Sequence, residues 1–357
     1  ASDAILKQSF DLNAMDPEFE WPQVWTTNLA IDQQLGGGFL ATLEGIYSND
    51  LNAVFVRNAD LAPPVRTLPD GRPYFGGAGA NELNDDPTRA DDDGAGIYVI
   101  DNTGIGYSFN VTAQLRKSFA FGLNASLGYS YTKAESALRS TEIASALWQS
   151  IPTSGHPNVP ISAPSEFGQR HRIVGAATYA KQWNRTLRTS FGLFFEMAEG
   201  NRFAGAPSNR YSFIYAGDVN GDGQTGNDLI YIPRDQSEIV LEQFVDAGGA
   251  TITVDDQWTR LNAFIEQDDY LSQHRGEIAE RNGAVNPWYN TIDLRILQDF
   301  AFGGGGRRHG FQLSVDMLNI ANFIDSDWGV RDVASSAATS PLSLSPTTPF
   351  DANGAPV

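Results

Sequence analysis

The sequence predicts an all-β fold, an antiparallel up-and-down transmembrane β-barrel fragment of about eight strands, with short turns on one side and long loops on the other. Three observations lead to this prediction. Apolar and hydrophilic residues alternate with period two through eight segments. The connections between these segments alternate between short and long, and aromatic residues gather near both ends of the segments.

The alternation is clearest in a hairpin formed by residues 107–119 and 121–132. In its first half, YSFNVTAQLRKSF, every second residue from Tyr107 to Leu115 is apolar and the residues between them are hydrophilic. This pattern is typical of a strand with one apolar face. We expect six further strands, at residues 22–35, 39–57, 171–183, 186–197, 288–300 and 311–321.

The connections fall into two classes of length. Short ones are expected at residues 36–38, around Ala120, around Asn184 and at 302–310. Hairpins that cross a membrane have short turns on one side and elaborated loops on the other, whereas a soluble sandwich has no reason to sort its loops in this way. The long connections are residues 58–98, 134–170, 198–287 and everything after about 322.

Aromatic residues lie near the two ends of the predicted strands, as they do in the girdles of outer-membrane barrels. Beside the short turns are Phe39, Phe119, Phe121, Trp183, Phe300 and Phe302, and near the opposite ends are Tyr47, Tyr129, Tyr131 and Phe195.

The hydrophilic phase of the strands contains charged residues, and a charge that faces hydrocarbon costs about 2–4 kcal/mol at the bilayer midplane. We therefore predict that this phase faces a polar lumen or its plug. We also predict that these charges, Asp293 and Arg295 on one strand and Asp316 on its hairpin partner, form cross-strand ion pairs rather than contacts with a substrate. The predicted lumen-facing residues are Arg116, Arg188, Asp293, Arg295 and Asp316.

Composition excludes several classes of protein. The 357 residues include 43 acidic and 24 basic ones, a formal charge of −19, which disfavours nucleic acid and anionic surfaces as partners. There is no cysteine, so disulfides and thiolate metal sites are excluded. No apolar run is long enough for a spanning helix, and no signal peptide follows Ala1.

Catalytic motifs are missing from the sequence. HExxH, GxSxG and P-loop patterns are absent, and the four histidines do not have the spacing of metal ligands. We therefore expect that the protein is not an enzyme.

The best ligand candidate is the stretch GDVNGDGQTGNDLIYIP, which begins at Gly217. It supplies four residues at the first, third, fifth and seventh positions of a calcium loop: Asp218, Asn220, Asp222 and Gln224. The next acidic residue, Asp228, comes one place too early, and no helical pattern flanks the stretch. Bound calcium would need a geometry other than an EF-hand, and the alternative is a loop that Asx turns and glycines order by themselves.

The long loops differ in character. Residues 58–98 are rich in Pro, Gly and Asp, which is typical of irregular structure, and Trp148 lies in a Pro- and Ser-rich loop that we expect at the surface. Within residues 256–281 the apolar residues recur at helical spacing, which predicts a short amphipathic helix packed on neighbouring loops. Those residues are Trp258, Leu261, Phe264, Ile265 and Leu271.

Several longer blocks carry a family resemblance. EFEWPQVWTTNLAIDQQL, EGIYSNDLNAVFVRNADL, YAGDVNGDGQTGNDLIYIP and FQLSVDMLNIANFIDSDWG, among others, resemble the barrel of Oar-like TonB-dependent outer-membrane receptors, in the expected order over most of residues 18–329. In that family a carboxypeptidase-regulatory-like domain and a plug precede the barrel. The resemblance implies an outer membrane location in a Gram-negative bacterium and capture of a solute by the extracellular loops, followed by TonB-driven movement of the plug.

The resemblance also implies how much of a barrel is present. Barrels of this transporter class have about 22 strands around a plugged lumen. Residues 1–357 are therefore expected to form part of one barrel domain that lacks the plug, the N-terminal domain and the final strands. Because its edge strands would lack neighbours, we expect an open, curved sheet. The implied partners are outer-membrane lipid, the TonB complex and an extracellular solute of unknown identity.

Two alternative functions fit parts of the sequence. A passive porin-like channel would have the same strands and loops without a plug or a TonB box. A secreted, soluble β-protein that binds glycans would instead turn its apolar phase toward a dry core.

Overall fold

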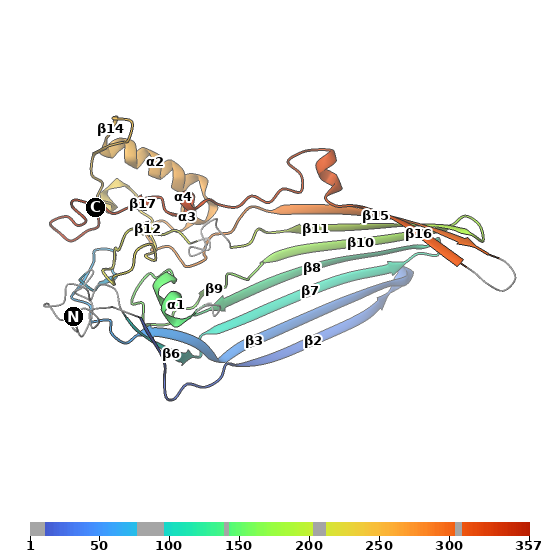
Figure 1. Cartoon of the computed structure of the whole chain (residues 1–357), viewed down its shortest axis with the longest axis horizontal. Helices are drawn as coiled ribbons and strands as arrows, with labels where there is room; N and C mark the ends of the chain where they lie inside the picture. The colour runs from blue at the N-terminus through green and yellow to red at the C-terminus, as the bar shows by residue number, and fades with distance from the viewer. Residues whose placement is uncertain (1–10, 77–95, 139–142, 203–211, 304–308) are drawn as a thin grey trace, which may run out of the picture.

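One curved sheet dominates the fold, and folded loops cover one of its ends (Figure 1). The computed structural model describes residues 11–76, 96–138, 143–202, 212–303 and 309–357. All eight predicted strands are confirmed: β2 (Gln23–Leu35), β3 (Phe39–Asn58), β7 (Gly106–Ser118), β8 (Leu123–Ser136), β10 (His171–Gln182), β11 (Leu187–Ala198), β15 (Tyr289–Phe302) and β16 (His309–Met317).

These eight strands pair in chain order, each antiparallel to the next, from β2 and β3 through β7, β8, β10, β11 and β15 to β16. Among the described strands, β2 and β16 do not pair with each other, so the sheet stays open. The open, curved sheet agrees with the prediction. The last strand is shorter than expected, because Asn319 adopts a left-handed conformation and a 3₁₀ helix, η3 (Ile320–Phe323), follows.

The prediction of about eight strands is too low, because the sheet has 11 strands and one pair in it is parallel. The additional strands are β1 (Leu12–Met15), β6 (Ile97–Thr103) and β9 (Ala163–Pro164). β6 pairs with residues 53–58, the end of β3 that projects beyond the paired part of β2. Its residues Tyr98 and Val99 are both buried, so the one-sided alternation that revealed the other strands is absent here.

The remaining elements are short and lie in the loops. Three further two-stranded sheets pair β4 (Arg66–Thr67) with β5 (Pro73–Tyr74), β12 (Tyr215–Ala216) with β17 (Leu342–Ser343), and β13 (Phe244–Val245) with β14 (Thr251–Ile252). The helices are α1 (Ala144–Ser150), α2 (Val254–Gln267), α3 (Asp269–Gln273) and α4 (Ser336–Thr339), with 3₁₀ turns η1 (Gly36–Gly38) and η2 (Gln236–Glu238). No described helix is long and apolar enough to cross a membrane.

Short turns and long loops lie at opposite ends of the sheet, as predicted (Figure 1). At the short-turn end Gly122 has a φ of 93°, which glycine adopts readily, and its N–H donates to the carbonyl of Phe119 at 3.0 Å. The side chain of Asn184 orders the next turn by accepting the backbone N–H groups of Thr186 and Leu187. Part of the predicted short connection 302–310, residues 304–308, lies outside the described residues.

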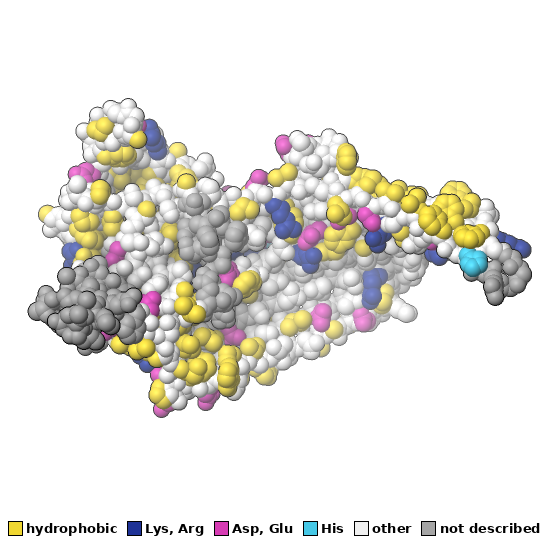
Figure 2. All heavy atoms as spheres, in the orientation of Figure 1, with side chains coloured by type: hydrophobic (Ala, Val, Ile, Leu, Met, Phe, Trp, Pro, Cys, Tyr) yellow, Lys and Arg dark blue, Asp and Glu magenta, His cyan; other side chains and the backbone are white. Residues whose placement is uncertain are grey.

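Large apolar side chains of the sheet are exposed. Leu29, Leu127 and Leu313 are 71%, 55% and 52% exposed, and hydrophobic side chains run along the strands at the short-turn end in Figure 2. The soluble alternative required these residues to face a dry core. A sheet that leaves such side chains uncovered is instead suited to contact with hydrocarbon.

The register places the five charged residues of the hydrophilic phase on one face. From β7 to β8, Arg116 lies opposite Ser126, and from β8 to β10, Ser126 lies opposite Ala176. From β10 to β11, Ala176 lies opposite Phe194, and from β11 to β15, Phe194 lies opposite Asp293. Directly opposed residues share a face of a sheet. Arg116 and Asp293 are therefore on the same side, although four strand boundaries separate them.

The other charged residues follow from the same register. Arg295 is two residues from Asp293 and lies opposite Asp316, with which it forms the predicted cross-strand ion pair. Arg188 lies opposite Asp299, whose position has the same parity as Asp293 and Arg295. The carboxylate of Asp293 accepts the backbone N–H of Asn319 at 2.8 Å.

The buried core lies among the loops. One cluster joins Phe213, Leu229 and Ile230 to the buried face of α2 and α3, which includes Leu261 and Ile265 and confirms the predicted amphipathic helix. A second cluster surrounds Trp148, which is 1% exposed; its predicted surface position is wrong.

Trp148 is buried because α1 packs it beside Tyr98 of β6, with ring centroids 5.5 Å apart. We call the folded loops around the two clusters the cap.

The exposed face of the sheet gives a test of its contact with lipid. Leu127→Arg, in the middle of β8, is expected to reduce the free energy of unfolding in lipid vesicles by about 2–4 kcal/mol, because the guanidinium would face hydrocarbon. The matched control is Ala176→Arg, on the face that carries Arg116 and Asp293, where the loss is expected to be small. Denaturant titration followed by tryptophan fluorescence measures both, and equal losses would contradict the assignment of the faces.

Candidate functional site

The residues with the greatest potential for chemistry lie in the cap. They form an acidic loop, residues 217–233, and a cavity that adjoins it. The loop comes from the connection between β11 and β15, and the cavity is closed by residues from four other parts of the chain. The acidic loop contains the predicted calcium ligands.

Asp218 organises the first turn of the acidic loop. Its carboxylate accepts the backbone N–H groups of Gly221, Asp222 and Gly223 at 2.6, 3.2 and 3.0 Å. Gly221 and Gly223 have φ values of 71° and 86°, in the left-handed region that favours glycine. The spacing of aspartates and glycines in the sequence therefore produces a series of Asx turns.

The side chains of Asp228 and Asp222 lie inside the acidic loop and accept hydrogen bonds from its backbone. Asp228 is fully buried and accepts the backbone N–H groups of Val219 and Asn220 at 2.7 and 3.2 Å. Asp222 accepts the N–H of Gln224 at 2.9 Å, and its second oxygen lies 3.1 Å and 3.4 Å from the amide nitrogens of Asn220 and Asn227.

A cation from a distant part of the chain enters this cluster. Arg72, 1% exposed, donates from Nε to Asp70 at 2.7 Å and from Nη2 to the carbonyl of Leu229 at 2.7 Å. Its Nη1 lies 3.5 Å from Asp228 Oδ1, and its guanidinium lies 5.6 Å from the ring centroid of Tyr215. Sequence reasoning missed Arg72 because it lies in a segment that was read only as irregular, more than 140 residues before the loop.

Burial and mutual repulsion raise the pKa values of the aspartates. Burial raises the pKa of Asp228 to about 7, against the attraction of Arg72, and burial together with the neighbouring Asp218 raises the pKa of Asp222 to about 6. Burial also raises the pKa of Asp218, although three N–H donors oppose the change. The cluster is therefore short of positive charge at neutral pH.

The structure joins four of the predicted calcium ligands, Asp218, Asn220, Asp222 and Asp228, by hydrogen bonds, and Gln224 contacts this group through its backbone N–H. Oxygen is the ligand type that calcium prefers, and two buried oxygens, Asn227 Oδ1 and Asp228 Oδ1, have no hydrogen-bond partner. On the other hand, no group of three or more acidic or histidine side chains within the described ranges is arranged to hold a metal ion. In this geometry the carboxylates order the loop, which is the alternative that the sequence left open.

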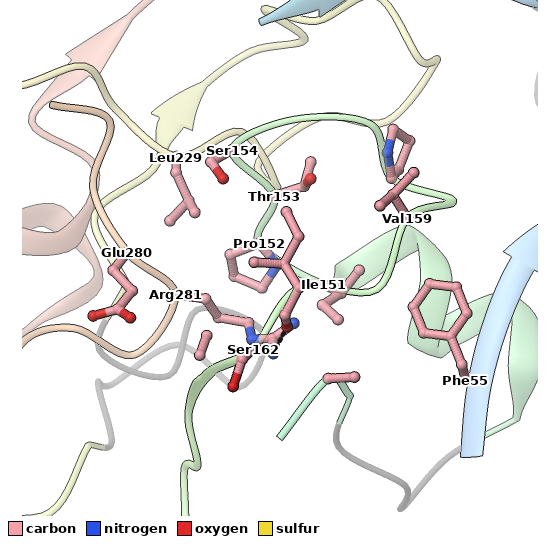
Figure 3. Close-up of a pocket in the computed structure, with 14 residues that line it drawn as sticks. Phe55, Ile151, Pro152, Thr153, Ser154, Val159, Ser162, Leu229, Glu280 and Arg281 are labelled. Atoms are coloured by element: carbon pink, nitrogen blue, oxygen red, sulfur yellow. Dashed lines mark hydrogen bonds between the residues drawn. The ribbon is translucent and has the colours of Figure 1, made fainter. Parts of the chain in front are cut away.

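The cavity lies directly beside the acidic loop and has a volume of about 60 Å³ (Figure 3). Two backbone hydrogen bonds join its wall to the loop: Thr153 N–H donates to the carbonyl of Asn227 at 2.8 Å, and Leu229 N–H donates to the carbonyl of Thr153 at 3.0 Å. The lining is largely apolar and includes Phe55, Ile151, Pro152, Ala163 and Leu229, with Glu280 and Arg281 as its charged members.

The second predicted group of residues lies on the sheet and not in the cap. Asp293, Arg295 and Asp316 line a hollow of about 500 Å³ together with Thr178 and Gly192. Arg116 and Arg188 lie on the same face, in other strands. Whether this face borders a lumen stays a prediction.

The model of a family described as an outer membrane beta barrel domain matches residues 1–337. Among solved structures, the outer membrane transporter YddB from Escherichia coli is similar, with a TM-score of 0.39 and 10% sequence identity; the match covers 88% of this chain and 31% of that chain. The chain thus spans about a third of that transporter's length. No curated protein matches the sequence.

The ion pairs of Arg72 give a test of what holds the acidic loop. Arg72→Met is expected to destabilise the cap by about 3–5 kcal/mol at pH 8, because it leaves buried carboxylates without their cation. Hydrogen exchange of the amides of residues 218–230 measures the change. The matched control is Arg66→Met, since Arg66 is exposed and its guanidinium lies over the rings of Tyr74 and Phe350, away from the aspartates.

The dependence of this effect on pH identifies its cause. The folded-state pKa values of Asp222 and Asp228 lie above the unfolded value of 3.8, so stability is greatest near pH 4 and falls as pH rises toward 7. Removal of Arg72 therefore destabilises the cap less at pH 4 than at pH 8. A loss that is the same at both pH values would show that the guanidinium acts by packing alone.

Proposed function

The chain belongs to the outer membrane beta barrel domain family, and from this membership we propose that it is the barrel part of an Oar-like TonB-dependent active transporter. It lies in the outer membrane. The observation that most supports the proposal is the separation of the two ends of the sheet: one end has tight turns, and the other carries a cap with its own hydrophobic clusters.

The cap is the part of the molecule suited to capture a solute. Its two clusters hold the loops in defined positions, and the second cluster and the cavity wall also include residues from the ends of β3 and β6. In the proposed mechanism the solute binds at the cap and then passes a plug that TonB moves. The charged face that carries Arg295 and Asp316 would border that plug.

The rival function is a passive channel, and conductance separates the two. In planar lipid bilayers the full-length protein is expected to show no steady conductance, because a plug fills the lumen, and to bind the periplasmic domain of TonB in a pull-down assay. A steady ohmic conductance without TonB binding would contradict active transport and support the porin-like alternative. A wide-pore porin of known conductance serves as the positive control.

Calcium at the acidic loop is a second proposal. Asn227 Oδ1 and Asp228 Oδ1 support it because neither oxygen accepts a hydrogen bond, although Asp228 Oδ1 is paired with Arg72 at 3.5 Å. The shortage of positive charge around Asp218, Asp222 and Asp228 also supports it. A divalent cation there would supply the missing charge, with Asn220 and Gln224 as further oxygen donors. Arg72 would then neutralise only part of the cluster.

Calorimetric titration of the refolded full-length protein with calcium chloride tests this proposal. Wild type is expected to release or absorb heat on binding, and Asp222→Ala is expected to lose that heat because it removes an oxygen donor from the centre of the cluster. Asp246→Ala, in the exposed turn between β13 and β14, is the matched control and is expected to bind as wild type does. Flat traces for all three proteins would rule out the site.

A further inference from the structure

We infer that the cavity beside the acidic loop binds a small carboxylate that terminates an amino acid or a short peptide, and that Arg281 is the group that recognises it. The inference deepens the proposed function and rests on it, because it names the chemistry of the captured solute. Four observations lead to it: the two donor nitrogens of Arg281 that have no acceptor among the described residues, the absence of an acidic partner for this arginine, the character of the cavity wall, and the charge of the chain.

Arg281 has donors without acceptors. Its Nη2 donates to the carbonyls of Ser136 and Ile161. Within the described part of the chain, Nε and Nη1 have no hydrogen-bond acceptor, and neither is sealed away from solvent. Figure 3 shows the side chain reaching past Ser162 toward Ile151, into the space that the lining residues enclose.

Arg281 also lacks an acidic partner, which is unusual for an enclosed guanidinium. No carboxylate of the described residues lies within 4.0 Å of it, although Glu280 and Glu166 act on it from farther away. Burial lowers the pKa of Arg281 to about 10, so the side chain remains charged at neutral pH. Two carbonyls hold the guanidinium in place through Nη2, and the N–H groups of Nε and Nη1 are left for a ligand. A carboxylate matches a cation of this kind, because it accepts a charge-assisted hydrogen bond from Nε or from Nη1.

The wall of the cavity limits the size of the ligand and the polarity of the group next to its carboxylate. A volume of about 60 Å³ is several times what one buried water requires, and too small for a nucleotide or an oligosaccharide. Pro152, Ala163 and Leu229 are buried and apolar, so the group next to the carboxylate has to be small and partly apolar. The side chains of alanine and of similar residues meet this requirement.

The charge of the chain decides between a simple anion and a zwitterion. A formal charge of −19 repels solutes with a net negative charge, but it does not repel a zwitterion. Glu280 is exposed and lines the same cavity, without a basic partner within ion-pair distance among the described residues. An ammonium group that lies outside the cavity would therefore meet a favourable potential. Free amino acids and short peptides both combine these two charges.

Calorimetry on the refolded full-length protein tests the inference, with L-alanine, L-alanyl-L-alanine and L-alaninamide as probes. At least one of the first two is expected to bind, and L-alaninamide is expected to give no heat because it lacks the carboxylate. Binding of L-alanine alone would identify free amino acids as the source, and binding of the dipeptide would identify peptides. No binding of either carboxylate probe, or equal binding of L-alaninamide, would overturn the inference.

Variants distinguish the loss of the Arg281 hydrogen bonds from a general loss of folded structure. Arg281→Met is expected to weaken binding by about tenfold to a hundredfold, the effect of losing hydrogen bonds to a charged group. Arg260→Met, an exposed arginine on α2, is the matched control and is expected to bind normally. Should Arg281→Met fail to fold, Val159→Trp blocks the cavity from an exposed position and is expected to abolish binding. Unchanged affinity in the folded Arg281→Met or Val159→Trp variant would overturn the inference.

The outcome is independent of the conductance test. If the protein forms a steadily open channel but binds a carboxylate probe through Arg281, the inferred site would be supported and active transport would be contradicted. If the protein binds TonB but neither carboxylate probe, the transport proposal would be supported and the inferred site would be contradicted.

Discussion

The antiparallel backbone ladder is the constraint on which the rest of this structure depends. In hydrocarbon every backbone N–H and carbonyl needs a partner within the protein, and only helices and paired strands supply one throughout. The strands between β2 and β16 meet this requirement in chain order, whereas the outer edges of β2 and β16 have no partner among the described strands. The large side chains on one face, such as Leu127 and Leu313, are uncovered by protein, so the long hairpins have no core of their own, whereas the ends of β3 and β6 contribute buried residues to the cluster around Trp148.

Because the long hairpins lack a core, the burial that stabilises a water-facing structure is concentrated in the cap. There the apolar residues of α2, the acidic loop and the residues around Trp148 form two clusters. The polar interior of the cap depends on long-range pairs, of which Arg72 with Asp228 joins residues 156 positions apart. A buried cation in a group of aspartates is costly to remove, since its partners cannot regain water without opening the loop.

The sequence predicted those parts of the fold in which each face of a strand or helix meets a single kind of surrounding, such as lipid, polar groups or a buried core. Strands such as β7 alternate because one face meets lipid and the other meets polar groups, and α2 shows the period of a helix with one buried face. β6 was missed because it is buried on both faces, and the burial of Trp148 was missed because its pocket is formed by a distant strand. Among site residues, the acidic loop was visible as a motif. Arg72 and Arg281 were not, since their significance arises from contacts with segments remote in the chain.

Backbone hydrogen bonds join the acidic loop directly to the wall of the cavity. Thr153 contributes to the cavity wall and exchanges two backbone hydrogen bonds with Asn227 and Leu229, and the carbonyl of Leu229 also accepts a bond from Arg72. Movement of this wall by an entering group would therefore strain the same short segment that carries Asp228. The reverse also holds, because a change in the charge around Asp228 acts on Arg72 and, through Leu229, on the cavity. Coupling of this kind needs no motion of the sheet, whose register is fixed by its ladder, so the response to a bound group stays within the cap.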